Sequence, residues 1–70
     1  MSSLYDLMNT YQSCIDRQKQ VISINRVKLN SAIENGNFEE MRQLRRLLNT
    51  LYDEKTELEY LYNCLSNYVN

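Results

Sequence analysis

Two cysteines and a group of acidic residues are the side chains of this 70-residue chain that come closest to a chemical site. Asp53, Glu54 and Glu57 could supply carboxylate ligands to a metal ion, and a cysteine thiolate could act as a nucleophile. The chain contains no histidine, so it lacks the Glu-x-x-His pairs of di-iron bundles and the usual base that activates a thiol. We therefore expect no catalytic residue, no metal site and no cofactor, and we interpret the acids as solubilising charges and intrahelical ion pairs.

Composition narrows the class of function further. A single glycine excludes the glycine-rich loops that bind phosphates, and no apolar run approaches the roughly 20 residues of a membrane span. Eight basic and nine acidic residues give a net charge of −1, which argues against a strongly electrostatic nucleic-acid or membrane binder. The first residues show no signal-peptide pattern, so we expect a cytoplasmic protein with reduced thiols and with neither a membrane nor a small-molecule substrate as partner.

The elements that must position these side chains are two helices separated by one break. The chain has no proline, and its single glycine, Gly36, suits the left-handed residue that ends a helix. Asn37 then suits an N-cap, with Glu40 three residues later as in a capping box. We therefore predict one domain over residues 1–70, helical over most of its length, with a first helix over about 3–34, a loop over about 35–37 and a second helix over about 38–68.

Apolar residues repeat at intervals of seven in both predicted helices, which indicates wide apolar faces. The two adjacent rows of the first helix are Met8, Ile15, Ile22 and Leu29, and Leu4, Tyr11, Gln18, Asn25 and Ala32. Those of the second helix are Leu44, Leu51, Leu58 and Leu65, and Met41, Leu48, Lys55, Tyr62 and Val69. Continuing the first stripe past Gly36 reaches polar residues, so the pattern predicts an all-α, antiparallel helical hairpin rather than one long helix.

The hairpin brings the leucines of the second helix against the first apolar row of the first helix. We expect these residues to be buried together: Leu44, Leu48, Leu51, Leu58 and Leu65 with Met8, Ile15, Ile22 and Leu29. In this geometry Cys14 lies opposite residue 58, about 9 Å along the helix from Cys64, which is beyond disulfide reach. We expect both cysteines to be small apolar residues at the edge of the core.

Two helices shield only one side of each other, so part of these wide faces stays wet. We predict assembly into a four-helix bundle or a coiled-coil-like dimer, with either a second copy (a homodimer) or a larger helical protein as the partner. Basic residues gather in the half of the hairpin near the loop and acidic residues in the other half. Two hairpins packed antiparallel would then pair opposite charges, although ordinary solvated faces also explain the pattern.

Three polar residues interrupt the apolar rows: Gln18, Asn25 and Lys55. A buried polar layer costs stability and can fix the register and the number of partners. Alternatively, Gln18 and Lys55 extend to the edge of the core and keep their polar ends in water. The sequence does not choose between these two arrangements.

Apolar residues outside the main rows point to a further surface. We predict a partner interface formed by Val21, Ile24, Val27, Tyr52 and Tyr60. Tyrosine is common at interfaces because it joins a large apolar ring to a polar tip. The same residues could instead pack inside a wide homodimer core. The function that we predict is a small non-enzymatic protein–protein interaction module of the assembly, regulatory or co-chaperone type.

The basic residues near the loop suggest an alternative function. Arg42, Arg45 and Arg46 share one side of the second helix. The possible basic patch consists of Arg26, Lys28, Arg42, Arg45 and Arg46. In length and hairpin shape, though not in motifs, the chain resembles the dimeric plasmid copy-number regulators of the Rop type, which implies a Rop-like regulator that binds RNA or DNA. Neighbouring glutamates and the net acidic charge make nucleic acid the less favoured partner.

Overall fold

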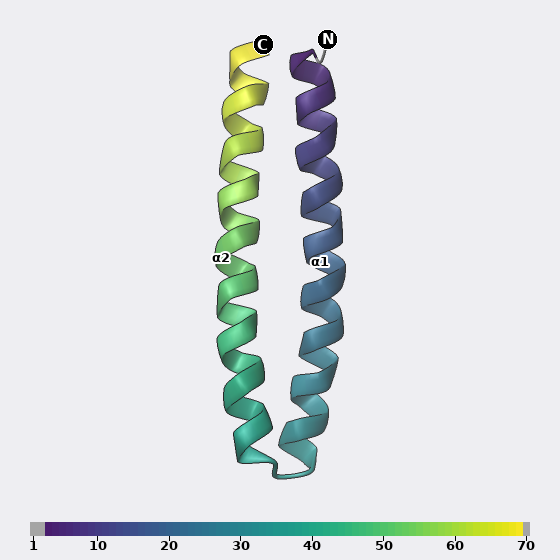
Figure 1. The fold of residues 1–70 in the computed structure, drawn as a ribbon, viewed down its shortest axis with the longest axis vertical. Helices are drawn as coiled ribbons and strands as arrows, with labels where there is room; N and C mark the ends of the chain where they lie inside the picture. Colours follow the sequence, from purple (N-terminus) through teal and green to yellow (C-terminus); the bar gives the residue numbers. More distant parts are fainter. Residues whose placement is uncertain (1–2, 70) are drawn as a thin grey trace.

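The computed structural model describes residues 3–69 and consists of two long helices packed side by side in opposite directions (Figure 1). Helix α1 spans Leu4–Glu34 and α2 spans Phe38–Val69. Their bounds lie within one residue of the predicted ranges, and the predicted all-α helical hairpin is confirmed. The start of α1 and the end of α2 lie side by side at the end of the hairpin opposite the loop.

Helix α1 begins with a complete capping box. The Ser3 hydroxyl accepts a hydrogen bond from the backbone N–H of Asp6 at 3.1 Å, and the Asp6 carboxylate accepts one from the backbone N–H of Ser3 at 3.2 Å. These bonds occupy backbone donors that have no partner inside the helix. The acidic side chain also lies at the positive end of the helix dipole.

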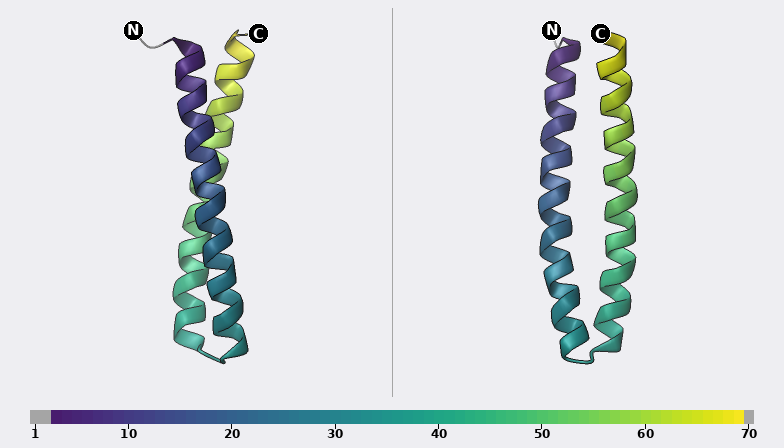
Figure 2. Two further views of the ribbon diagram at one scale, coloured as in Figure 1. Left: turned by 90° about the vertical axis from the view of Figure 1, so that its right-hand side faces the viewer. Right: turned by 180° about the vertical axis from the view of Figure 1, so that it is seen from behind.

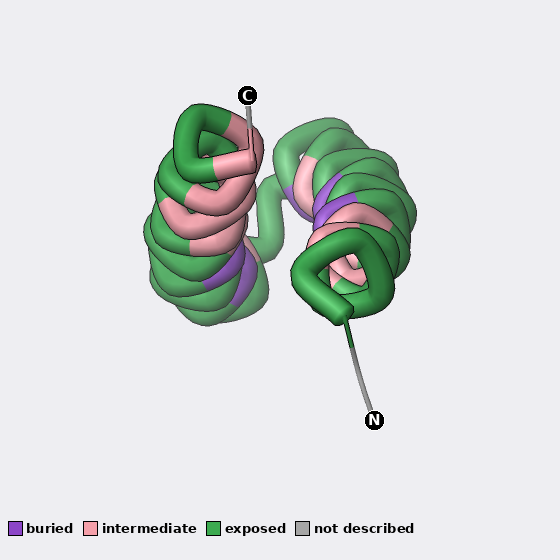
Figure 3. The backbone as a smooth tube through the Cα atoms, turned by 90° about the horizontal axis from the view of Figure 1, so that it is seen from above, coloured by how far each residue is buried: buried purple, intermediate pink, exposed green. Residues whose placement is uncertain are grey.

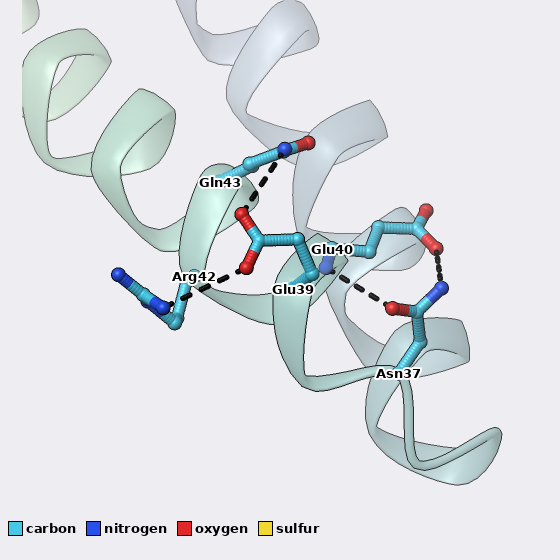
Figure 4. Close-up of polar contacts among 5 residues, drawn as sticks. All are labelled: Asn37, Glu39, Glu40, Arg42 and Gln43. Atoms are coloured by element: carbon cyan, nitrogen blue, oxygen red, sulfur yellow. Dashed lines mark hydrogen bonds and ion pairs between the residues drawn. The ribbon is translucent and has the colours of Figure 1, made fainter.

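The loop ends one helix and begins the next within three residues. Gly36 has φ +65°, and the N–H groups of Gly36 and Asn37 donate to the carbonyls of Ile33 and Ala32 at 3.1 and 2.9 Å, which is a Schellman motif. Asn37 also caps α2, because its Oδ1 accepts from the backbone N–H of Glu40 at 3.2 Å (Figure 4). Since the Asn37 backbone N–H is already used, the Glu40 carboxylate accepts from the Asn37 side-chain amide instead, also at 3.2 Å.

We expect Gly36→Ala to lower the free energy of unfolding by about 1 kcal/mol, because a side chain in the left-handed region costs roughly 1–2 kcal/mol. The site is otherwise open, since a Cβ at Gly36 would meet no atom within 4 Å. Urea unfolding followed by circular dichroism measures this loss. Gly36→Asn is the matched control and should cost less, because asparagine tolerates this conformation. Equal losses for both variants would contradict this explanation.

Most of the core lies in the half of the hairpin near the loop, and Ile15 extends it past the middle of α1. Six apolar side chains are buried among the described residues: Ile15, Ile22 and Ala32 of α1, and Leu44, Leu48 and Leu51 of α2. In Figure 3 the buried segments face each other between the two helices. The prediction of deep burial is therefore confirmed for five of the nine residues and wrong for four, Met8, Leu29, Leu58 and Leu65, which are only half-buried.

The molecule is a rod with extents of 50 × 17 × 14 Å (Figures 1 and 2). The side view in Figure 2 shows the two helices crossing each other along their length, as packed helices do. The radius of gyration of the hairpin is 15.9 Å, whereas a compact domain of this length would have a radius of about 11 Å. Each helix therefore has one covered side, and most of its other residues are exposed.

Candidate interaction surfaces

The hollows on this surface do not resemble an active-site cleft. Two of them measure about 470 and 460 Å³, and each is lined by one helix alone. The first is lined by Asp53, Glu54, Glu57 and Leu58 of α2, and the second by Lys19, Gln20, Ser23 and Ile24 of α1. Ligand sites usually lie where several elements converge. No group of three or more potential metal-binding side chains occurs within residues 3–69. The candidate site is therefore a surface rather than a pocket.

Gln18 fixes the register of the two helices. Its Nε2 donates to the backbone carbonyl of Leu51 at 3.3 Å and to the Glu54 carboxylate at 2.8 Å. Residue 18 therefore lies level with residue 54, and residue i of α1 lies level with about residue 72 − i of α2. This pairing agrees with the geometry predicted from the sequence.

The three polar residues that interrupt the apolar rows, Gln18, Asn25 and Lys55, are buried to different extents. Asn25 is buried, with 8% of its surface exposed, and its Nδ2 donates to the Val21 carbonyl at 2.8 Å within its own helix. Lys55 is half-buried and its Nζ lies 3.4 Å from the Glu59 carboxylate, on the same helix. Asn25 and Gln18 thus extend the core, whereas the ammonium group of Lys55 reaches its edge.

One side of the hairpin carries several apolar side chains among polar and charged ones. On α2, Glu54 belongs to a row of residues at intervals of seven that also contains Leu47, Leu61 and Tyr68. On α1, the row that contains Gln18 lies directly beside the row of Leu7, Cys14 and Val21. The Gln18–Glu54 bond shows that these rows meet on one side of the hairpin. We call this side the lateral face. It includes the next row outward on each helix and consists of Leu7, Thr10, Cys14, Arg17, Val21, Ile24, Lys28 and Ser31 of α1, with Glu40, Gln43, Leu47, Thr50, Glu54, Glu57, Leu61, Cys64 and Tyr68 of α2.

The hairpin itself leaves much of the lateral face uncovered. Leu7, Ile24, Leu47 and Tyr68 are exposed, and the exposed fractions of Ile24 and Leu47 are 56% and 43%. Val21 is half-buried, because it packs against the core cluster of Ile22, Leu48 and Leu51. The opposite side is more polar in its middle, where a hollow is lined by Gln12, Ile15, Lys19, Glu59, Tyr62 and Asn63.

The five predicted interface residues do not lie on one surface. Val21 and Ile24 belong to the lateral face. Val27 is 66% exposed but lies on the back of α1, away from α2. Tyr52 borders the opposite side, and Tyr60 lies on the back of α2. The residues that complete a surface around Val21 and Ile24 are Leu7, Leu47, Leu61 and Tyr68, none of which was among the residues predicted for the core or the interface.

Tyr60 interacts with a cysteine one turn further along α2. A hydrogen bond with the Cys64 side chain raises the pKa of Tyr60 above its ordinary value of 10.0, and the charge of Cys64 adds to this effect. Burial and the charge of Glu57 contribute less. These contacts favour the neutral phenol over the phenolate.

Both cysteines are free thiols. Cys14 is half-buried at the edge of the core, as predicted, whereas Cys64 is exposed, so the prediction of a core-edge position is wrong for Cys64. Cys64 belongs to the α2 row with Gln43, Thr50 and Glu57, and this row faces away from α1. The spacing of seven residues does not by itself show which rows of α2 face α1.

The predicted basic patch is exposed but divided. Arg26, Arg42, Arg45 and Arg46 lie on the side away from the lateral face, whereas Lys28 lies on the lateral face. Arg42 lies 3.6 Å from the Glu39 carboxylate, which also accepts from Gln43 (Figure 4). A hollow of about 300 Å³ beside these arginines is lined by Leu29, Ile33, Phe38, Met41, Arg42 and Arg45. The positive charge is thus interrupted by acids and apolar groups.

No protein-family model matches this chain, and neither a curated protein nor a solved structure matches it. Neither α1 nor α2 contains an apolar segment of the length that a membrane-spanning helix needs. The fold described above and the chemistry of its surfaces are therefore the basis for assigning a function.

Proposed function

We propose that this chain is a small, non-enzymatic protein–protein interaction module of the cytoplasm, of the assembly, regulatory or co-chaperone class, that binds its partner through the lateral face. The observation that carries the proposal is the set of exposed apolar side chains on one side of the hairpin. Ile24 and Leu47 lie level with each other there, beside the half-buried Val21, and Leu7 lies on the same side nearer the chain ends. Contiguous exposed apolar patches on soluble proteins mark interaction sites, whereas single exposed apolar residues do not.

A protein partner fits this surface better than nucleic acid does. Binding of RNA or DNA by a Rop-like regulator is the alternative function. The lateral face contains two basic and three acidic residues, Arg17, Lys28, Glu40, Glu54 and Glu57. Phosphate backbones are bound by clusters of positive charge, and acids in the same surface repel them. The apolar residues between these charges have no counterpart on a nucleic-acid backbone.

A pair of matched variants in cell extract tests this function. The chain, labelled at its N-terminal amine, is added to extract of its source cells and followed by fluorescence-detected sedimentation. We expect it to sediment in a complex larger than the 8.4-kDa monomer. Ile24→Glu should weaken that complex tenfold or more, about 1.4 kcal/mol, because a charge replaces an apolar contact. Val27→Glu makes the same change at an exposed site outside the lateral face and should leave the complex intact.

Circular dichroism checks that both variants keep the helicity of the parent chain, since both positions are exposed. Sedimentation of the parent chain as a monomer in extract would contradict the proposed function. An equal effect of Val27→Glu would place the interface on the back of α1 instead of on the lateral face.

A further inference from the structure

The hairpin exposes more surface than a compact chain of its mass, and the difference is about the area that one protein–protein interface covers on each partner. Its accessible surface is 5532 Å², whereas a compact monomer of 8.4 kDa would expose about 4,600 Å². The difference is about 900 Å². A stable protein–protein interface buries about 800 Å² on each partner. Covering one side of the rod with a second rod of the same kind would therefore remove the excess.

The two helices contribute opposite charges to the lateral face. The α1 rows contain Arg17 and Lys28 and no acid, whereas the α2 rows contain Glu40, Glu54 and Glu57 and no base. Neither Arg17 nor Lys28 forms an ion pair among residues 3–69, where the pairs are Arg42–Glu39 and Lys55–Glu59. A second lateral face that places α2 opposite α1 would supply the missing acids.

A two-fold axis along the rod produces this arrangement. Two hairpins that face each other with their loops at the same end place α1 of each against α2 of the other. Residue i of one copy then lies level with about residue 72 − i of its partner, as it does within each hairpin. Arg17 would lie level with residue 55, between Glu54 and Glu57 of the partner subunit. Lys28 would lie level with residue 44, one turn from Glu40 of the partner subunit.

The apolar residues match in the same arrangement. Ile24 lies level with residue 48, beside Leu47 of the partner subunit, and Leu7 lies level with residue 65, between Leu61 and Tyr68 of the partner subunit. Apolar groups thus meet apolar groups at Leu7 and Ile24, and bases meet acids at Arg17 and Lys28, whereas Val21 lies level with residue 51, between Thr50 and Glu54 of the partner subunit. Both kinds of match are required of a specific interface, because unmatched polar groups lose their water without gaining a partner.

The opposite orientation matches less well on this face. With the loops at opposite ends, α2 packs against α2 and α1 against α1. Glu54, near the middle of α2, then lies close to Glu54 of the partner subunit, and Arg17 lies within about a turn of Arg17 of the partner subunit. Such like-charge contacts oppose association. The separation of charge between the two halves of the rod, which favours antiparallel hairpins, is thus outweighed by the residues on the face that makes contact.

We propose that the occupant of the lateral face is a second copy of this chain, in a two-fold dimer with both loops at the same end, which forms a four-helix bundle. This inference rests on the proposed function and names its partner. Each Arg17 pairs with Glu54 and Glu57 of the partner subunit, and Ile24 and Leu7 pack on the apolar residues of the partner's α2. Because of the two-fold symmetry, each of these contacts occurs twice in the dimer.

Charge exchange in the purified chain tests the dimer. Sedimentation equilibrium should give a mass twice 8.4 kDa for the parent chain. Arg17→Glu should raise the dissociation constant tenfold or more, because each dimer then contains two sites of repulsion. Glu57→Arg should weaken the dimer similarly, and the double variant should regain most of the affinity. Arg26→Glu makes the same change as Arg17→Glu on the side of α1 away from the lateral face and should leave the dissociation constant unchanged.

A disulfide tests the orientation independently. Thr10 would lie level with residue 62, about 3 Å along the axis from Cys64 of the partner subunit. In a chain with Cys14→Ser and Thr10→Cys, mild oxidation should yield a covalent dimer on a non-reducing gel. With the loops at opposite ends these residues lie far apart, so a non-covalent dimer without this cross-link, or without rescue by Glu57→Arg, would overturn the proposed arrangement.

The outcomes separate this inference from the proposed function. A pure chain that is helical and monomeric at the highest concentration at which it stays soluble would overturn the dimer. If the same chain still sediments in a complex in extract, the interaction module stands and its partner is a different protein. A chain that is monomeric in both experiments contradicts both proposals.

Discussion

Leu51→Ala is expected to lower the free energy of unfolding by roughly 2–4 kcal/mol, the cost of removing a buried leucine side chain and leaving a cavity. Leu51 is 8% exposed and belongs to the central cluster with Ile22 and Leu48. A core with six buried apolar side chains in the described residues cannot close easily around the space that is left. Because small domains are stable by only about 5–15 kcal/mol, this loss is a large share of the total.

Urea unfolding followed by circular dichroism measures the effect, with all variants at one protein concentration because association contributes to stability. Leu4→Ala is the control, since it removes the same atoms from a side chain that is 38% exposed in the first turn of α1. We expect a clearly smaller loss for Leu4→Ala. Equal losses would show that the central cluster contributes no more than the helix ends do, and would contradict this prediction.

Asn25→Leu is expected to raise the free energy of unfolding by about 2 kcal/mol, because a buried polar side chain is replaced by an apolar one of similar size. The Asn25 amide bonds only to the Val21 carbonyl of its own helix. That carbonyl can still accept from the backbone N–H of residue 25 in the regular helix, so the substitution leaves no buried group without a partner. The new side chain lies level with residue 47 and meets the leucines of α2.

Asn30→Leu is the matched control for this gain, because residue 30 is an exposed asparagine in the same helix. It should show only the higher helix propensity of leucine, about 0.5 kcal/mol. The same unfolding measurement compares the two. A loss of stability in Asn25→Leu would mean that leucine does not fit this layer, and that asparagine is required there for packing as well as for register.

The folding of this chain into a hairpin follows from local chemistry that the sequence displays. Gly36 is the residue whose backbone can adopt φ +65°, and the next residue, Asn37, has the side chain that caps a helix. The change in phase of the apolar rows across this break then requires two helices that face each other. Each of these features depends on residues within a few positions of one another, which is why the sequence predicts them.

The extent of burial along the rod depended on side chains that meet only in the folded hairpin. Leu51 and Leu58 belong to the same row of leucines at intervals of seven, so periodicity predicts equal burial for them. The structure buries Leu51 but leaves Leu58 half-exposed. In the half away from the loop, the long side chains of Tyr11, Lys55 and Tyr62 replace shorter ones, and their polar ends need water.

The sequence by itself thus determined the two helices, the position of the break, the capping and the level at which each residue of α1 meets α2. Only the tertiary structure decided which half closes, that Gln18 reaches across to α2 while Asn25 bonds within α1, and which flanking rows meet on one side. The physical reason is the range of the interactions. Capping and periodicity act over a turn or two of one helix, whereas burial and the composition of the lateral face depend on residues of the other helix, such as Ile22 with Leu51 and Gln18 with Glu54, which are 29 and 36 positions apart in the chain.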